Sequence, residues 1–133
     1  MVEKVKIKGG RKVPKTYVPK SLSPSDRKKQ VESIRKGTDR PKLKSFKGKR
    51  STYTEEFEKK YGKKNKNREW IHKNLLRKEG QDQIIKKGMG AYYSSGSRPN
   101  QTPYSWGMAR LYSVIMGGSA RRVDKKIWDK YKV

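Results

Sequence analysis

Few residues of this sequence could do chemistry, and the first candidates are glycines. Gly88, Gly90 and Gly96 could expose backbone N–H groups to a phosphate, as glycine-rich loops do. Their spacing departs from the G-x-G-x-x-G and Walker patterns, and no convincing strand precedes them. The spacing therefore favours a structural loop over a nucleotide-binding one.

Metal and acid–base chemistry lack the residues that they require. The chain has no cysteine, and His72 is its single histidine, in a lysine-rich stretch without a second imidazole to share a metal. The glutamates lie near lysines at helical spacing, which is typical of solvated ion pairs rather than of general acid–base pairs. These glutamates are Glu55, Glu56, Glu58, Glu69 and Glu79. We therefore expect no enzyme, no cofactor and no small-molecule substrate.

Aromatic and guanidinium groups offer a third kind of chemistry, stacking on nucleic-acid bases. The residues of this kind in one window are Tyr92, Tyr93, Arg98, Tyr104, Trp106 and Arg110. The alternative is that Tyr104 and the residues after it form a core, while two tyrosines hold the preceding loop against it and leave their hydroxyls at the surface. We favour the core role, and we expect Tyr92, Tyr93 and Arg98 to contact a neighbouring protein.

Positive charge is the strongest signal in the sequence. The 133 residues include 37 Lys and Arg against 12 Asp and Glu, a formal net charge of +25. Such a chain seeks polyanions: nucleic acid, an acidic protein surface or an anionic membrane. With 30% hydrophobic residues it cannot bury a large core throughout. We predict an extended basic arm over residues 1–50 and a small α-helical domain over residues 51–133, which includes a Gly/Ser/Tyr loop at 88–102.

The arm is predicted to bind the partner. Residues 1–50 carry 18 basic and 4 acidic side chains, which can neutralise phosphates with strongly salt-dependent affinity or lie between acidic protein surfaces. The apolar residues Val18, Leu22, Leu43 and Phe46 could then fill pockets of a protein partner, and a tail that binds only nucleic acid would not require them. The predicted partner-binding residues of the arm are Arg11, Lys12, Lys15, Tyr17, Lys20, Arg27, Lys28, Lys29, Arg40, Lys42, Leu43, Lys44, Phe46, Lys47, Lys49 and Arg50.

Local signals place one helix inside the arm. Ser23 can act as N-cap with Pro24 at the first helical position, and Gly37 stands where a left-handed C-terminal cap is expected. Upstream, Val5 and Ile7 alternate with lysines as in an edge strand, over few residues. The residues that follow the helix have the composition of an extended basic segment.

Caps and apolar spacing predict the helical domain. Thr52 and Glu55 have the spacing of a capping box, which begins a helix that ends at Gly62. Its buried face is predicted to consist of Tyr53, Phe57 and Tyr61. A third helix is predicted over about Glu69–Glu79, before Gly80. Its apolar side holds Trp70, Ile71, Leu75 and Leu76.

The last third of the chain is predicted to be a loop followed by two helices. Residues 89–102 are too rich in Gly, Ser, Pro and Asn for regular structure. Thr102 and Pro103 begin the strongest helix, which ends at Gly117–Gly118. Its core-facing residues are Tyr104, Met108, Leu111, Tyr112 and Ile115. Asp124 is predicted to cap a short final helix. The fold class is therefore mainly α, with three to five short helices and a long extended N-terminal arm.

Three segments of the chain resemble one protein family. They are PKTYVPKSLSPSDRKKQVESIRKGTDRPKLKSFKGKRS (14–51), FEKKYG (57–62) and GAYYSSGSRPNQTPYSWGMARLYSVIMGGSARRVD (90–124). The family consists of short, basic, functionally uncharacterised proteins of large nucleo-cytoplasmic DNA viruses of algae and amoebae, and SSGSRPNQTP is the most specific part of the resemblance. The resemblance implies a viral origin and supplies no catalytic residue.

In that setting we expect a non-enzymatic virion structural protein. The leading hypothesis is a minor capsid (cement) protein on the inner face of a large icosahedral shell, tied to other capsid proteins by its basic arm. The alternative is a nucleic-acid-binding protein that packages or condenses the viral genome, and a third is attachment of the arm to an anionic inner membrane. The first residues lack a signal-peptide pattern and no apolar run is long enough to span a membrane. We therefore expect synthesis in the host cytoplasm, without secretion or a transmembrane segment.

Overall fold

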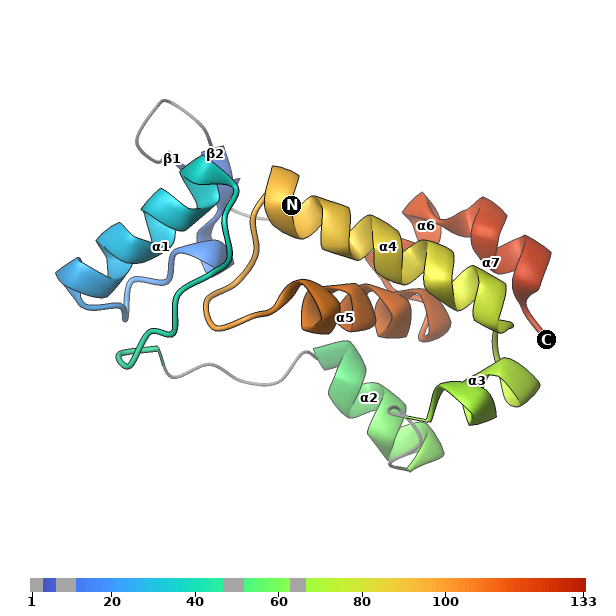
Figure 1. The fold of residues 1–133 in the computed structure, drawn as a ribbon. Helices are drawn as coiled ribbons and strands as arrows, with labels where there is room; N and C mark the ends of the chain where they lie inside the picture. Colours follow the sequence, from blue (N-terminus) through green and yellow to red (C-terminus); the bar gives the residue numbers. More distant parts are fainter. Residues whose placement is uncertain (1–3, 7–11, 47–51, 63–66) are drawn as a thin grey trace. The chain divides into compact units, whose positions relative to one another are not determined.

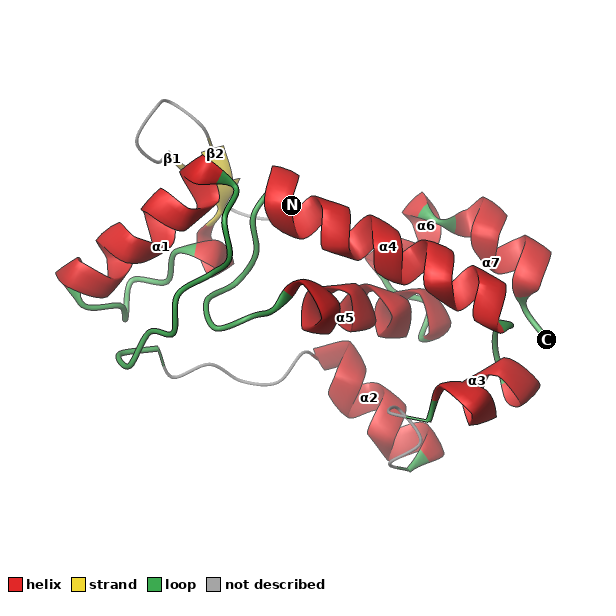
Figure 2. Cartoon of the chain, in the orientation of Figure 1, coloured by secondary structure: helices red, strands yellow, loops and turns green. Residues whose placement is uncertain are grey.

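The computed structural model describes residues 4–6, 12–46, 52–62 and 67–133 (Figure 1). Over these ranges the chain forms seven α-helices, a short 3-10 helix and one two-stranded sheet (Figure 2), so the predicted mainly α class is confirmed. The helices exceed the three to five predicted, because residues 80–94 and 119–123, which were not predicted to be helical, lie in helices as well. The chain divides into two compact units. Unit 1 comprises Met1–Lys49 and Gly90–Pro103, and unit 2 comprises Arg50–Met89 and Tyr104–Val133.

Unit 1 is built on a small sheet and one helix. Its elements are β1 (Lys4–Lys6), β2 (Lys12–Pro14), the 3-10 helix η1 (Lys15–Tyr17) and α1 (Pro24–Lys36). The strands pair antiparallel, with Val5 opposite Val13. A core of Val13, Val18 and Ile34 lies between sheet and helix. The predicted strand at Val5 is confirmed, and Ile7 lies outside the described residues.

The caps of α1 are those predicted from the sequence. The Ser23 hydroxyl accepts a hydrogen bond from the Asp26 N–H at 3.2 Å, and Pro24 occupies the first turn. Gly37 ends the helix at a φ of 66°, and its N–H donates to the Ile34 carbonyl. The helix is therefore defined locally, although its apolar stripe is thin.

The N-terminal part of the chain is folded, so the prediction of an extended arm is wrong for the described residues. Val18, Leu22 and Leu43, expected to anchor in a partner, are buried in unit 1. The reason is that residues 90–103 belong to the same unit and supply the covering surface that the N-terminal sequence lacks. The observed division of the chain therefore differs from the predicted arm and domain.

Unit 2 is a helical unit with a larger core. Its elements are α2 (Thr52–Tyr61), α3 (Arg68–Asn74), α4 (Lys78–Ser94) up to Met89, α5 (Pro103–Ile115) from Tyr104, α6 (Ser119–Val123) and α7 (Lys125–Tyr131). Its fully buried residues include Phe57, Ile71, Leu76, Ile84, Leu111 and Val114. The predicted apolar face of α2 is confirmed at Phe57, and Gly62 follows the helix at a φ of 70°. The side chain of Thr52, the predicted cap, lies outside the described ones.

Glycines of the predicted loop belong instead to α4, which continues to Ser94. A Cβ on Gly88 would lie 2.6 Å from the Gly107 Cα, and a Cβ on Gly107 would lie 2.7 Å from the Ile85 carbonyl oxygen. Both glycines therefore allow the backbones of α4 and α5 to approach closely. The prediction of a loop from residue 88 was wrong because glycine here serves packing between helices rather than a turn.

The predicted helix over Glu69–Glu79 is interrupted in the structure. Helix α3 ends at Asn74, and α4 begins at Lys78. Between them Leu76 is buried and forms a backbone bridge with Lys132 near the C-terminus. The Lys78 N–H, at the start of α4, donates to His72 Nδ1 at 2.8 Å. The bridge to Lys132 thus interrupts the helix, although the helical spacing of apolar residues is continuous in the sequence.

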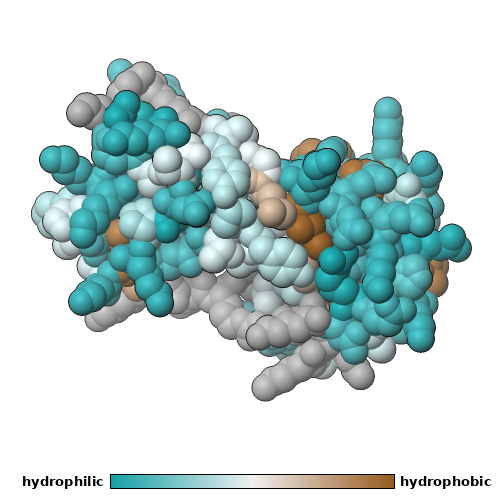
Figure 3. Space-filling model, in the orientation of Figure 1, coloured by the Kyte–Doolittle hydropathy of each residue, from teal (hydrophilic) through white to brown (hydrophobic). Residues whose placement is uncertain are grey.

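The surface of the described residues is mostly polar. Hydrophilic residues cover most of the face visible in Figure 3. Tyr104, predicted to face the core, is 50% exposed, because the buried run of α5 begins one turn later at Gly107. None of the helices in the described ranges combines the length and the apolar content needed to cross a membrane.

Candidate functional site

Helix α1 presents one face to the core of unit 1 and basic side chains elsewhere. Its buried residues are Asp26, Gln30, Ser33 and Ile34. Its exposed basic residues are Arg27, Lys28, Lys29, Arg35 and Lys36. Since the buried residues fall on one side of the helix, the positive side chains occupy the remaining arc. The helix is thus a positively charged rod of about 20 Å, from the rise of 1.5 Å per residue.

The acidic residues of unit 1 neutralise little of this charge. Asp26 accepts hydrogen bonds from the Ser45 hydroxyl and from the Ser45 N–H, the latter at 3.0 Å, and these bonds hold its pKa below the usual carboxyl value. Asp39 accepts from the Tyr93 hydroxyl at 2.9 Å. Glu32 forms ion pairs with its neighbours on α1, Arg35 at 2.9 Å and Lys36 at 3.7 Å.

Eight of the twelve described residues that were predicted as the arm's partner-binding residues are exposed on unit 1. Seven of them, together with Arg98 of the predicted loop set, form what we call the basic surface: Lys12, Lys20, Arg27, Lys28, Lys29, Lys42, Lys44 and Arg98. None of these side chains forms an ion pair with an acidic residue in the described ranges. Lys15 is also exposed and has contacts within the chain. Arg11, Lys47, Lys49 and Arg50 lie outside the described residues.

Two predicted partner-binding residues, Arg40 and Tyr92, are instead buried against each other. The Tyr92 hydroxyl accepts from the Arg40 N–H at 2.6 Å and donates to the Gln101 carbonyl at 3.0 Å. The Arg40 guanidinium lies 4.7 Å from the centre of the Tyr92 ring and donates to the Thr38 carbonyl at 2.5 Å. Both residues hold unit 1 together, so their assignment to a partner surface was wrong.

Leu43 is likewise part of the interior. The Leu43 N–H donates to Asn100 Oδ1 at 2.7 Å, and Asn100 Nδ2 donates back to the Leu43 carbonyl at 3.2 Å. With its side chain 2% exposed, Leu43 cannot anchor the chain in a partner. Phe46 is half-buried. Tyr17 is half-buried too, and burial raises its pKa against the opposing charge of Arg98.

The loop that follows α4 is fastened to the N-terminal residues by buried polar contacts. Gln30, fully buried on α1, donates from Nε2 to the Tyr17 carbonyl at 2.9 Å and to the Ser97 carbonyl at 3.1 Å. A Cβ on Gly96, where φ is 98°, would lie 3.1 Å from Ile34. The sequence signal for these contacts was Gln30, a polar residue in the apolar stripe of α1, and this signal was not recognised.

Tyr93 remains at the surface, as predicted. Its ring is 42% exposed and makes an edge contact with Tyr92 at 5.1 Å between ring centres. The hydrogen bond from its hydroxyl to Asp39 raises its pKa. Arg98 is exposed as well. These two residues of the predicted loop set are therefore accessible, whereas Tyr92 is not.

Three basic residues that were not predicted to bind a partner, Arg121, Arg122 and Lys125, line a depression of unit 2.

In the described ranges no group of three His, Cys, Asp or Glu side chains lies together as metal ligands would.

Comparison with known proteins identifies a family. The model of a family of unknown function, DUF5824, matches residues 14–130. No curated protein and no solved structure matches the chain.

Proposed function

Since the chain belongs to the family of unknown function DUF5824, we propose a function from its geometry: a non-enzymatic structural protein that binds nucleic-acid phosphates through the basic surface of unit 1. The observation that carries this proposal is the excess of exposed positive charge on a folded unit. Residues 1–49 and 90–103 hold 18 basic side chains against 4 acidic ones. The described acidic residues are engaged by hydroxyl groups or by neighbours on α1.

Phosphate binding requires exposed positive charge, which the basic surface has along α1. Double-stranded DNA carries about one negative charge per 1.7 Å of axis, so a rod of lysines and arginines can release several of its counterions. Six of the eight cations of the basic surface are lysines, which bind phosphates as point charges. We therefore place the proposed contacts at the nucleic-acid backbone rather than at the base edges. We therefore expect little dependence on base sequence.

The packing of unit 1 favours nucleic acid over the threading of an arm between capsid proteins. A threading arm needs accessible apolar anchors, and Val18, Leu22 and Leu43 are buried. The resemblance to proteins of large DNA viruses supports a place in the virion, where such a protein would package or condense the genome.

A minor capsid role is the second proposal, and the exposed ring of Tyr93 favours it. Aromatic residues are enriched in protein interfaces, and among the described residues of unit 1 the ring of Tyr93 is the one large hydrophobic side chain that is exposed. In this role the basic unit would bind the acidic inner face of neighbouring capsid proteins as a folded body. Crosslinking within particles separates the two proposals: capsid neighbours support the second, and genome neighbours support the first.

The direct test is a salt titration with a labelled 20-base-pair duplex, followed by fluorescence anisotropy. The full chain should bind at low salt, with log K falling linearly against log salt, and equally for unrelated sequences. The variant R27Q/K28Q/K29Q should lower the slope by about 3, at roughly 0.9 per lost phosphate contact. The matched control K59Q/K73Q/K86Q removes three exposed lysines of unit 2 and should change the slope less.

Three results would count against the proposal. They are absence of duplex binding at low salt, binding that is unchanged at high salt, and equal slopes for the two triple variants. Binding to vesicles with acidic lipid in preference to the duplex would favour the membrane instead. Preference for an acidic polypeptide would favour the capsid role.

A further inference from the structure

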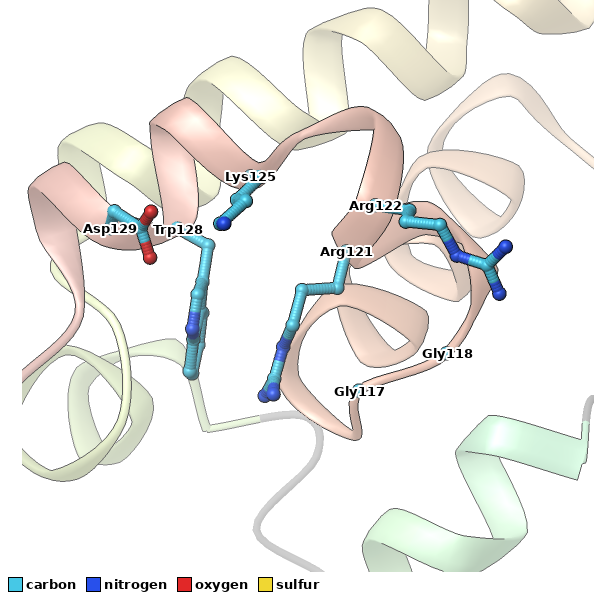
Figure 4. Close-up of a pocket in the computed structure, with 7 residues that line it drawn as sticks. All are labelled: Gly117, Gly118, Arg121, Arg122, Lys125, Trp128 and Asp129. Atoms are coloured by element: carbon cyan, nitrogen blue, oxygen red, sulfur yellow. The ribbon is translucent and has the colours of Figure 1, made fainter.

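A depression in unit 2 gathers basic residues from α6 and α7 at the end of α5 (Figure 4). Its volume is about 330 Å³. Its lining consists of Gly117, Gly118, Arg121, Arg122, Lys125, Trp128 and Asp129. The depression lies outside the basic surface of unit 1, in a unit with its own core.

Arg121 is fixed at the wall of this depression. Its Nε donates to the Val114 carbonyl at 2.8 Å, and its Nη2 donates to the Ile115 carbonyl at 2.7 Å. These are carbonyls at the C-terminal end of α5, where a cation is favoured. The guanidinium also lies 4.2 Å from the centre of the Trp128 ring. The orientation of the guanidinium is therefore set before any ligand arrives.

Gly117 leaves room for a ligand beside Arg121. A Cβ on Gly117 would lie 3.3 Å from Arg121 Nη1, the guanidinium nitrogen that makes neither of the two carbonyl bonds. The φ of 75° at this position also favours glycine. The N–H groups of Arg121 Nη1 thus border the depression next to Gly117, which has no side chain to cover them.

The charges around the depression are unbalanced. Arg122 and Lys125 are exposed, and neither forms an ion pair in the described part of the chain. The acidic residue of the lining, Asp129, pairs with Lys132 at 3.7 Å. In Figure 4, Lys125 lies on the same side as Arg121 and Trp128, whereas Arg122 extends away from Trp128. Three cations and one carboxylate, which already has a partner, therefore line the depression.

We propose that this depression is a phosphate-binding site for the nucleic-acid backbone, which gives the protein a second binding surface; the inference rests on the proposed function. Guanidinium groups match the geometry of phosphate oxygens, and a fixed guanidinium loses little entropy on binding. Arg121 covers one face of the Trp128 ring, and the ring packs against the core. The ring therefore lines the site and does not stack on bases. Arg122 and Lys125 then bind separate phosphates of one strand.

The test compares the full chain with R122Q/K125Q and with the control K59Q/K86Q, again with the labelled 20-base-pair duplex. Both variants remove two exposed charges of unit 2, and unchanged circular dichroism verifies that they fold. R122Q/K125Q should lower the slope of log K against log salt by about 2, at roughly 0.9 for each phosphate contact. The control should leave the slope close to that of the full chain.

Direct contact is measured by NMR of the full chain. Titration with the duplex should shift the amide of Gly117 and the side-chain N–H signal of Arg121 in the original sequence, and should shift them less in R122Q/K125Q. Equal slopes for both variants, or absence of shifts at these two residues, overturn the site. Failure of the proposed function has other signatures. Either the full chain binds no duplex at low salt, or R27Q/K28Q/K29Q binds like the full chain while R122Q/K125Q alone loses affinity.

Discussion

Replacement of Asp124 by Asn should destabilise unit 2 strongly. The Asp124 side chain is 0% exposed and accepts from Arg110 Nε at 2.7 Å, from Arg110 Nη2 at 2.9 Å and from Lys87 Nζ at 3.2 Å. It thereby joins α4 and α5 to the junction of α6 and α7. In the variant, Arg110 remains largely buried and loses its carboxylate partner.

The expected magnitude follows from the cost of leaving a buried charge unpaired. Removal of one partner from a buried ion pair costs about 3–5 kcal/mol. We expect about 3 kcal/mol, the lower end, because Lys87 is half-exposed and can turn to solvent. In a domain of this size, that loss lowers the melting temperature by about 12 °C or more.

The assay is urea unfolding at neutral pH, followed by circular dichroism. The matched control is D129N, because Asp129 is an exposed acidic residue of α7 with one partner at 3.7 Å, and it should change the free energy of unfolding by less than about 1 kcal/mol. If D124N changes the free energy of unfolding no more than D129N does, the reasoning is wrong.

Acidification provides an independent measurement on the same residue. Burial alone would raise the pKa of Asp124, but the hydrogen bonds and charges of Arg110 and Lys87 outweigh it and hold the pKa below the usual carboxyl value. The folded state therefore binds this proton less tightly than the unfolded state. Its contribution is complete above the unfolded pKa and is lost as the pH falls through the folded pKa. D124N should lose less stability than the original chain over that acidic interval.

Further predictions concern packing and the division of the chain. Gly88→Ala should cost about 1–3 kcal/mol, because the methyl group would meet the backbone of α5, whereas Gly90→Ala, with open space around it, should be neutral or stabilising in thermal unfolding. Tyr92→Phe should lower the free energy of unfolding by about 1–3 kcal/mol, because the Arg40 N–H and the Gln101 carbonyl lose their hydrogen bonds to the Tyr92 hydroxyl. Tyr93→Phe, at the surface, should lower it less, and urea unfolding measures both variants. Deletion of residues 1–49 should leave unit 2 helical and make residues 90–103 sensitive to protease, since their covering is removed; equal cleavage with and without the deletion would contradict this.

The sequence predicted best what depends on neighbouring residues. Ser23, Pro24 and Gly37 define α1 by hydrogen bonds and dihedral angles within a few positions, and the structure has these caps. Gly62 and Pro103 mark helix ends for the same local reason. The fold class follows from several such signals together.

The interior of unit 1 depended on contacts that no local pattern shows. Arg40 meets Tyr92 across 52 positions of the chain, and Leu43 meets Asn100 across 57. In the sequence, Arg40 and Leu43 resemble the exposed residues around them. Asp124 was predicted to cap α7, yet its side chain makes no cap hydrogen bond, because two distant cations hold it. The surface cations of the candidate site were found because charge alone defines them.

The discontinuity of unit 1 has a consequence for the time course of synthesis. Residues 1–49 leave the ribosome first, but the segment that completes their core and polar contacts ends at residue 103. At about 5–20 residues per second, the interval is roughly 3–11 s. During this interval residues 1–49, the most basic part of the chain, lack the contacts that residues 90–103 supply, while α2 and α3 are already being synthesised. Unit 1 therefore cannot complete its fold before α2, α3 and α4 of unit 2 have been made, and a nascent chain that stops before residue 103 completes neither unit.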